Sequence, residues 1–569
     1  MEGAELTLKN PYGARWLPYF WIIVACAVAH LWCLGSQFYM DDMPAIRDSE
    51  IVQSGNLGSL NTVSWTNFWY ILIYRIFGMS PVAYHAVNWL LHTAVACTLF
   101  AFGRDFLKEK WPAGVALFGA SLFAVHPLAS EIPNYARTQD LAWATLFSLL
   151  AAWAALRFLR DGGSLKLLFC GLAVVGALLS KGPGLFHALM AVTAVGLASM
   201  RREHWNFVKR RWIFIGGVAF LLVFAFWLTG IPSNWLKTTF RWSDPRFIGH
   251  AYTLSRVFWE FAWRAVIPVA LSSDHGITET LIPQDAPFWN IPDKGAMLAM
   301  ASFLTLTGFS VFLAWRKSTR LIGVCLFLFA ATILFRFLYL IPEFMPEYRI
   351  YPGLPWFCLG AAIVLAAAWR WMFETLSPRV PAIFLLGTLA SLSAKRSFVW
   401  HDLDRLTGDV LKRYPARARA LWELDDRDVD AGNWQAVIDR QKTMWPEIER
   451  QFVEGNKRLA PAREIPSGDF VLAMVAIHGR YARALAHTQS PMVGLNVMAQ
   501  LEAHMKRMQM TVENKPLEWA HFFRDKALIL ELAGNYAAAA ELLRQDIIVN
   551  SWPKDLERIE GKLAAKPDL

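Results

Sequence analysis

A series of apolar segments, each long enough to cross a lipid bilayer or nearly so, runs through the first two-thirds of this 569-residue chain. A transmembrane helix needs about 20 predominantly apolar residues, and roughly eleven such segments can be placed here. Their approximate ranges are 16–35, 82–102, 113–127, 141–158, 167–180, 184–200, 212–230, 296–315, 321–341, 353–370 and 380–394. The chain is therefore predicted to be an all-α polytopic membrane protein.

The composition agrees with this prediction. The chain is 55% hydrophobic and only 18% charged, with a mean hydropathy of +0.30, whereas about 25% of the residues of an ordinary soluble domain are charged. The net charge of +10 comes mostly from short basic clusters between apolar segments, as the positive-inside rule expects, so it does not indicate nucleic-acid binding. All six cysteines lie in or beside apolar segments without a CxxC pair, which argues against a disulfide framework or a zinc site.

The basic clusters also predict how the chain is oriented. With the N-terminus in the cytoplasm and the first segment kept as a signal anchor, alternate connections are short and basic. They carry Arg104/Lys108/Lys110, Arg157/Arg160/Lys166, Arg201/Arg202/Lys209/Arg210/Arg211, Arg316/Lys317/Arg320 and Arg370/Arg379. The loops 36–81, 126–140, 180–182, 231–295 and 343–352 and the C-terminal region then share the other face. That face is periplasmic in a bacterium and lumenal in a eukaryotic secretory membrane.

Near position 395 the long apolar runs stop and polar-faced helical periodicity begins, which predicts a transmembrane domain (1–394) and a soluble helical domain (395–569). The runs AGNWQAVI (431–438) and LAGNYAAAAELL (532–543) share a Gly-Asn-aromatic turn, and IHGRYARAL (477–485) is a weaker copy. Such turns resemble those of tetratricopeptide hairpins, although the spacing here is irregular. The second domain is therefore expected to be tetratricopeptide-like.

Two adjacent carboxylates, Asp41 and Asp42, close the run FYMDD just after the first apolar segment. Adjacent like charges raise each other's pKa, and an enzyme that removes a proton from an acceptor hydroxyl needs a carboxylate base. The structural alternative is a solvated loop in which Asp42 caps a helix. The other polar clusters predicted on the same face favour a catalytic pair.

Three cations on separate loops, Arg137, Lys181 and Arg349, are candidates for binding a phosphate, because a departing phosphate requires positive charge. Each has a structural alternative. Arg137 can pair with Asp140, Lys181 can extend to the membrane interface, and Arg349 can pair with Glu347.

Other polar residues on this face are expected to support the site. His85 shares one helix stripe with Asn88 and His92, where interhelical hydrogen bonding explains them as well as substrate contact does. The other supporting candidates are His126, Glu131, Asp274 and Glu347. No ligand cluster demands a metal, although carboxylates at the site could bind a divalent ion, so the sequence requires no cofactor.

Six short motifs then occur in an order that resembles GT-C glycosyltransferases. They are DDMPAI (41–46), YHAVNWLLH (84–92), LFAVHPLASE followed by NYARTQDLAWA (122–144), LLSKGPG (178–184), LSSDH (271–275) and PEYRIYPGLP (346–355). The chain is most similar to the transmembrane and tetratricopeptide-repeat protein O-mannosyltransferases and their bacterial relatives.

This resemblance implies an enzyme that moves a sugar, with inversion, from a polyprenyl-phosphate carrier in the bilayer to Ser or Thr hydroxyls of an exported protein such as a pilin. The expected location is a bacterial inner membrane, with the active site and the helical domain in the periplasm. The resemblance gives the base and acceptor-positioning role to Asp41-Asp42 and maps the other family motifs onto His126, Glu131, Lys181, Glu347 and Arg349.

The sequence leaves three alternatives open. The same donor chemistry can serve a lipid or polysaccharide acceptor. A transporter is less favoured, because transporters usually carry ionisable groups near the middle of the membrane and these clusters lie at one face. A noncatalytic scaffold is supported by Gly182, where the family often has Glu after the motif lysine.

Overall fold

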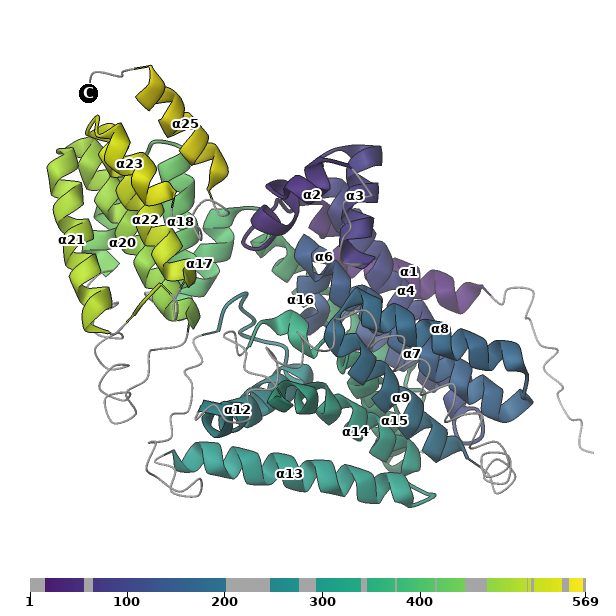
Figure 1. The fold of residues 1–569 in the computed structure, drawn as a ribbon. Helices are drawn as coiled ribbons and strands as arrows, with labels where there is room; N and C mark the ends of the chain where they lie inside the picture. The colour runs from purple at the N-terminus through teal and green to yellow at the C-terminus, as the bar shows by residue number, and fades with distance from the viewer. Residues whose placement is uncertain are drawn as a thin grey trace, which may run out of the picture.

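The computed structural model describes residues 16–55, 65–200, 246–275, 293–338, 345–373, 376–414, 417–444, 446, 468–508, 510–512, 516–544 and 552–565. Every regular element within these ranges is helical. The N-terminal helices form a large apolar body, and the C-terminal helices form a smaller one beside it (Figure 1). The predicted all-α polytopic architecture is confirmed.

Eight helices in the described part of the chain are long and apolar enough to cross a membrane. They are α1 (Leu17–His30) with the turn that follows it to Gly35, α4 (Pro81–Leu107), α7 (Gln139–Asp161), α9 (Gly182–Ser199), α13 (Lys294–Trp315), α14 (Arg320–Leu334), α15 (Leu354–Met372) and α16 (Arg379–Val399). A bent pair adds a ninth span if it crosses as one unit, and α8 (Ser164–Ser180) is a shorter apolar helix. Each predicted segment coincides with one of these, except 212–230, which lies outside the described residues.

The bent pair explains how the chain leaves the membrane at the segment 126–140. Helix α5 (Ala113–Ala124) ends just before His126-Pro127, and the chain then turns by 54°. Proline cannot donate a backbone hydrogen bond and clashes with the preceding turn. The Nδ1 atom of His126 accepts a hydrogen bond from Leu128 N at 3.1 Å and starts the new turn, which leads to α6 (Glu131–Asn134).

Glycine sets the distance between α8 and α9. A Cβ atom at Gly184, in the first turn of α9, would overlap the carbonyl oxygen of Ala177 in α8. Small residues allow such close approach between transmembrane helices. The packing matters for the site, because Lys181 is the single extended residue that joins the two helices.

We expect Gly184→Val to force α8 and α9 apart and to destabilise the protein by about 1–3 kcal/mol, the usual cost of overpacking. Gly196→Val is the matched control, because Gly196 lies in the same helix and a Cβ there would meet no atom within 4 Å. Thermal unfolding of the purified protein in detergent measures both variants. Equal melting temperatures for the two would contradict this account of the packing.

The segment 36–81, which the sequence presents as a loop, contains helices in its described parts, 36–55 and 65–81. It contains a turn (Met43–Arg47), α2 (Glu50–Gln53) and α3 (Trp65–Phe77). Tyr70 of α3 is buried, and its hydroxyl donates to the carbonyl oxygens of Ala136 and Arg137, each at 3.3 Å. The segment is thus packed onto the 126–140 segment and buries one side of it.

The C-terminal body contains α17 (Leu403–Arg413), α18 (Ala418–Asp430), α20 (Gly468–Thr488), α21 (Pro491–Arg507), α22 (Pro516–Leu532), α23 (Tyr536–Leu543) and α25 (Pro553–Ala564). Two predicted Gly-Asn turns occur where expected, after α18 and after α22. Gly432 and Gly534 have φ angles of 73° and 78°, in the left-handed region that favours glycine at helix ends.

The third predicted turn is wrong, because the run 477–485 lies inside α20. Gly479 has a different reason to be small: a Cβ atom there would overlap the carboxylate of the buried Asp525 in α22. The glycine therefore allows two helices to pack closely and does not make a turn. The predicted domain boundary at 394/395 falls within α16, which continues to Val399; the division into two domains stays a prediction.

Candidate active site

Asp42 is fully buried and anchors its loop to the 126–140 segment. Its Oδ1 atom accepts a hydrogen bond from Arg137 N at 2.6 Å, and its Oδ2 atom accepts one from Tyr39 N at 3.4 Å. Burial raises the pKa of Asp42 well above its ordinary value, although these main-chain donors oppose the shift. The carboxylate makes no capping bond to the Met43–Arg47 turn, so the helix-cap alternative is not what the structure shows.

Asp41 points the other way and remains accessible. Its side chain is 49% exposed, and its Oδ1 atom lies 2.8 Å from Arg419 Nη2. Its main-chain N–H donates to the hydroxyl of Tyr135 at 3.1 Å. Met40, directly before it, has a φ angle of 51°, a conformation that costs a residue other than glycine about 1 kcal/mol or more. After this strained residue the two carboxylates point in opposite directions: Asp41 is accessible and Asp42 is buried.

The three candidate cations lie close to one another. The Oδ2 atom of Asp140 accepts from Lys181 Nζ at 2.9 Å and from Arg137 Nη1 at 3.2 Å. The ring centroid of Tyr348 lies 5.7 Å from Lys181 Nζ and 5.8 Å from the Cζ atom of Arg349. We call Arg137, Lys181 and Arg349 the cation cluster. Arg137 pairs with Asp140, as its structural alternative predicts, and Lys181 pairs with the same carboxylate.

Arg137 and Lys181 share the carboxylate of Asp140, and Arg349 adds a third positive charge near Lys181. Burial lowers the pKa of Lys181, Asp140 opposes this change, and Arg137 and Arg349 add to it. The side chains of Arg137 and Lys181 stay 38% and 31% exposed, so a ligand can reach both. A phosphate placed here would form charge-assisted hydrogen bonds and relieve the repulsion among the cations.

Glu131 and Glu347 position the short helical turn Glu347–Ile350, which carries Arg349. The Oε2 atom of Glu131 accepts from Tyr348 N at 2.6 Å. The Oε1 atom of Glu347 accepts from Ser272 N at 2.7 Å and lies 2.9 Å from His275 Nε2. Glu347 thus pairs with His275, and the turn that it anchors carries Arg349 toward Tyr348 and the cation cluster.

The candidate histidines hold main-chain segments in place. His126 Nε2 lies 3.0 Å from the carbonyl oxygen of Ala265, near the end of α12 (Arg246–Val266). His85 Nδ1 and Nε2 lie 3.1 Å from Pro133 O and 3.3 Å from Gln37 O. His85 therefore joins α4 to the two loops that carry the acidic pair and the cations. Both histidines therefore contact segments that carry the candidate site, and their supporting role stays a prediction.

The helical body also reaches this site, which the sequence does not predict. Arg417 binds both carboxylate oxygens of Asp274, at 2.7 and 2.8 Å. Arg419 binds Asp41, and Tyr39 donates to His401 O at 2.9 Å. Because 378 positions separate Arg419 from Asp41, no local pattern could have revealed the pair. Asp274 binds the helical body through Arg417, and its expected role in supporting the site stays a prediction.

Glu423 lies one turn after Arg419 in α18. Burial raises its pKa from 4.5 to about 7; Arg419 and a main-chain hydrogen bond from Met40 oppose the shift, while Asp426 and Asp41 add to it. The folded protein therefore keeps a proton that the unfolded chain releases near pH 4.5.

We expect the stability of the wild type, measured relative to Glu423→Gln, to fall as the pH rises from about 4.5 to about 7 and to stay level above that. The sign follows because the folded state binds more protons than the unfolded state in this window. Melting temperatures of both proteins across this range provide the measurement. A difference that does not vary with pH would contradict the assignment.

Among the described residues, no group of three or more His, Cys, Asp or Glu side chains is arranged to hold a metal ion. The site is instead a polar face at one end of a helical membrane body, with an exposed carboxylate on one side of the 126–140 segment and a cation cluster on the other. This defines a polytopic membrane protein whose polar face is suited to phosphate-linked chemistry.

The comparisons with known proteins agree with that description. No protein-family model matches the chain. The chain is 24% identical over 461 residues to a protein O-mannosyl-transferase of Caenorhabditis elegans, a match that covers 75% of this chain and 62% of the relative. It is also 32% identical over 157 residues to the protein O-mannosyl-transferase Tmtc1 of Drosophila melanogaster, covering 27% of this chain and 17% of the relative. The chain thus spans less than two-thirds of each relative's length. The similarity to protein O-mannosyltransferases that the sequence motifs predict is confirmed.

Proposed function

We propose that the protein is an inverting glycosyltransferase that moves a sugar from a polyprenyl-phosphate donor to a Ser or Thr hydroxyl of an exported protein. One observation carries the proposal: Arg137 links the acidic pair to the cations. Its main-chain N–H holds Asp42, which positions Asp41, and its guanidinium shares Asp140 with Lys181. A base and a phosphate site are thereby fixed on the same short segment.

The proposed reaction needs one base and one anion site. Asp41 takes the proton of the acceptor hydroxyl while the hydroxyl oxygen bonds to the anomeric carbon of the sugar. The bond from that carbon to the phosphate oxygen breaks, and the polyprenyl phosphate leaves with the electron pair. The cation cluster stabilises the negative charge that develops on the phosphate.

An apolar cavity of about 540 Å³ supports a lipid-linked donor. It lies among α14, α15 and α16 and the end of α12, and its walls include Phe329, Trp356, Leu365 and Leu389. His126, which begins the turn toward Glu131 and the rest of the site, also lines it. In the proposal the isoprenoid chain of the donor occupies this cavity, with its phosphate directed to the cation cluster.

The nature of the acceptor and of the sugar rests on the relatives and on the helical body. Both relatives are named protein O-mannosyl-transferases, which supports a protein acceptor and mannose as the sugar. The contact of α18 with Asp41 supports the proposal that the helical body presents an acceptor to the base. In a bacterium the site would lie on the periplasmic side of the inner membrane, and a pilin or another surface protein would be a suitable acceptor.

Intact-mass analysis of exported proteins tests the proposal in cells. Cells that carry the wild type, Asp41→Asn or Asp48→Asn are compared at equal levels of the membrane protein. Asp48 is the matched control, because it belongs to the same segment, is 54% exposed and pairs only with its neighbour Arg47 in the structure described. The proposal expects a protein that loses a sugar-sized mass in Asp41→Asn cells alone. Unchanged masses of the exported proteins in all three strains would overturn the proposal that the acceptor is a protein.

A further inference from the structure

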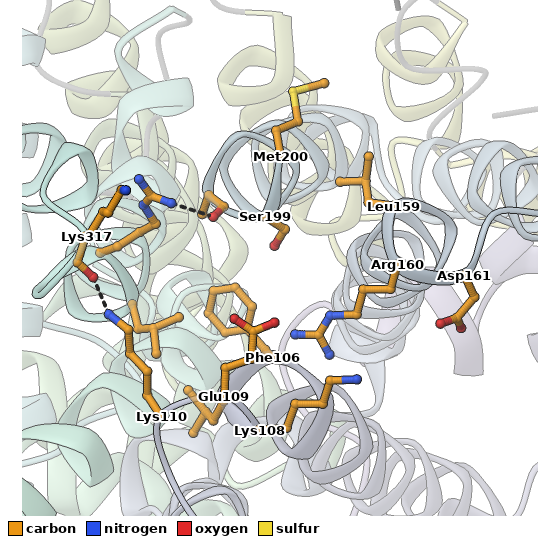
Figure 2. A pocket seen from close by; sticks show the side chains of 14 residues that line it. Phe106, Lys108, Glu109, Lys110, Leu159, Arg160, Asp161, Ser199, Met200 and Lys317 are labelled. Atoms are coloured by element: carbon orange, nitrogen blue, oxygen red, sulfur yellow. Dashed lines mark hydrogen bonds between the residues drawn. The ribbon is translucent and has the colours of Figure 1, made fainter. Parts of the chain in front are cut away.

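A second cavity, of about 450 Å³, lies at the opposite end of the helical bundle (Figure 2). It is bounded by the C-terminal ends of α4, α7 and α9 and by the connection that leads into α14. The candidate active site, in contrast, lies where α4, α7 and α9 begin. The two sites are therefore separated by the length of these helices, and the second cavity needs its own explanation.

The cavity is lined by both apolar and charged side chains. The apolar lining residues are Phe106, Leu107, Leu159, Ala198, Met200 and Leu321. The charged lining consists of Lys108, Lys110, Arg160, Lys317 and Arg320, with Glu109 and Asp161. Cations thus outnumber carboxylates by five to two, so the cavity attracts an anion.

Three of the cations already bind main-chain carbonyl groups. Arg320 Nη1 donates to Ala198 O at 3.1 Å, Lys110 donates to the carbonyl of Lys317 (Figure 2), and Arg160 donates to the carbonyl of Asp105. These bonds explain three cations as partners of the exposed carbonyls that helix ends and turns leave.

Lys108 and Lys317 are not explained in that way. Within the part of the chain that the structure describes, no hydrogen bond or ion pair is formed by the ammonium group of either residue. Figure 2 shows the Lys108 ammonium beside the Arg160 guanidinium at the opening, with the Glu109 carboxylate across from them. Lys108 and Lys317 are therefore the two lining cations whose ammonium groups have no hydrogen-bond or ion-pair partner among the described residues.

We propose that this cavity binds the headgroup of an anionic phospholipid from the leaflet at the basic face. Basic pockets between the ends of transmembrane helices are suited to lipid phosphates. The apolar lining residues then contact the upper part of the acyl chains, while Lys108 and Lys317 bind the phosphate. Phosphatidylglycerol combines a negative phosphate with hydroxyl groups that suit the polar side chains of the cavity.

The test uses the full-length protein purified in detergent. Its melting temperature is compared in detergent micelles that contain phosphatidylglycerol and in micelles that contain phosphatidylcholine. A lipid that binds only the folded protein raises its melting temperature. The double variant Lys108→Gln/Lys317→Gln removes these two cations. Its matched control, Arg316→Gln/Arg379→Gln, removes two exposed charges from connections at the same face but none that lines the cavity.

We expect phosphatidylglycerol to stabilise the wild type and the control pair equally, and to bind the Lys108/Lys317 variant about tenfold or more weakly. Equal stabilisation of both double variants would overturn the proposal, because attraction to the basic face as a whole would then suffice. Inorganic phosphate that stabilises the wild type as well as the lipid does would also overturn it in favour of a soluble anion. If the double variant does not fold in phosphatidylcholine, the single variant Lys108→Gln is compared with Arg379→Gln in the same way.

Discussion

Replacing Asp41 with Asn is expected to lower the rate of sugar transfer by about 10²–10⁴-fold, the usual contribution of a general base, while leaving the melting temperature close to that of the wild type. Asp41 is half exposed, and its described ion pair joins it to Arg419 at the surface. Exposed ion pairs contribute little to stability, with a median of about 0–1 kcal/mol. Loss of rate without loss of fold is therefore the result that distinguishes a base from a structural residue.

Asp42→Asn is expected to behave differently from Asp41→Asn. Both oxygens of the buried Asp42 carboxylate accept main-chain hydrogen bonds, and an amide group can accept only at one of the two positions. We expect a lower melting temperature together with a partial loss of rate, because the loop that positions Asp41 loosens. Initial rates and thermal unfolding of both variants and of Asp48→Asn separate the two roles. If Asp42→Asn were fully stable but inactive, Asp42 would be the better candidate for the base, and the roles assigned to Asp41 and Asp42 would be reversed.

The second large effect is expected at the cation cluster. Lys181→Gln removes one of the two cations that share Asp140, and Arg137 is then left to balance that carboxylate. Loss of one preorganised group that stabilises developing charge typically costs about 10²–10³ in rate. We expect a fall of about 10²-fold in kcat, with a smaller change in KM for the donor, because the charge on the phosphate is greatest in the transition state.

Lys181→Arg and Lys166→Gln complete this test. Arginine keeps the charge but not the compact geometry, so a partial rescue is expected. Lys166 is an exposed lysine near the other ends of the helices, where it pairs with Asp161, and its loss should leave the rate unchanged. A Lys181→Gln protein with normal kcat would exclude the cation cluster from leaving-group stabilisation.

The apolar segments were predictable because length and hydropathy alone define a span. The described helices α1, α4 and α13 to α16 begin within about two residues of the predicted ranges and end within about seven residues of them. The 36–81 region was not predictable in the same way. Its helix α3 is held by contacts such as Tyr70 to the carbonyls of the 126–140 segment, and such contacts depend on residues distant in the chain.

The candidate site was predictable in its residue types and only partly in its roles. Placing Arg137 and Lys181 on loops of one face anticipates that they lie together, and the structure joins them through Asp140. The sequence could not show which of Asp41 and Asp42 is exposed and which is buried. This difference arises from the φ angle of Met40 and from the position of the main-chain nitrogen of Arg137. Nor could it predict that Arg419 contacts Asp41, since the partners come from different helical bodies.

The most direct test of the central claim is transfer of a labelled sugar by the purified protein in proteoliposomes. The donor is polyprenyl-phosphate mannose, and the acceptors are the exported proteins of cells that lack the gene. The account predicts label on at least one exported protein with the wild type and with Asp48→Asn, little with Asp41→Asn or Lys181→Gln, and none from a nucleotide-linked mannose. Equal transfer by wild type and Asp41→Asn, or no transfer by a correctly folded wild type, would contradict it.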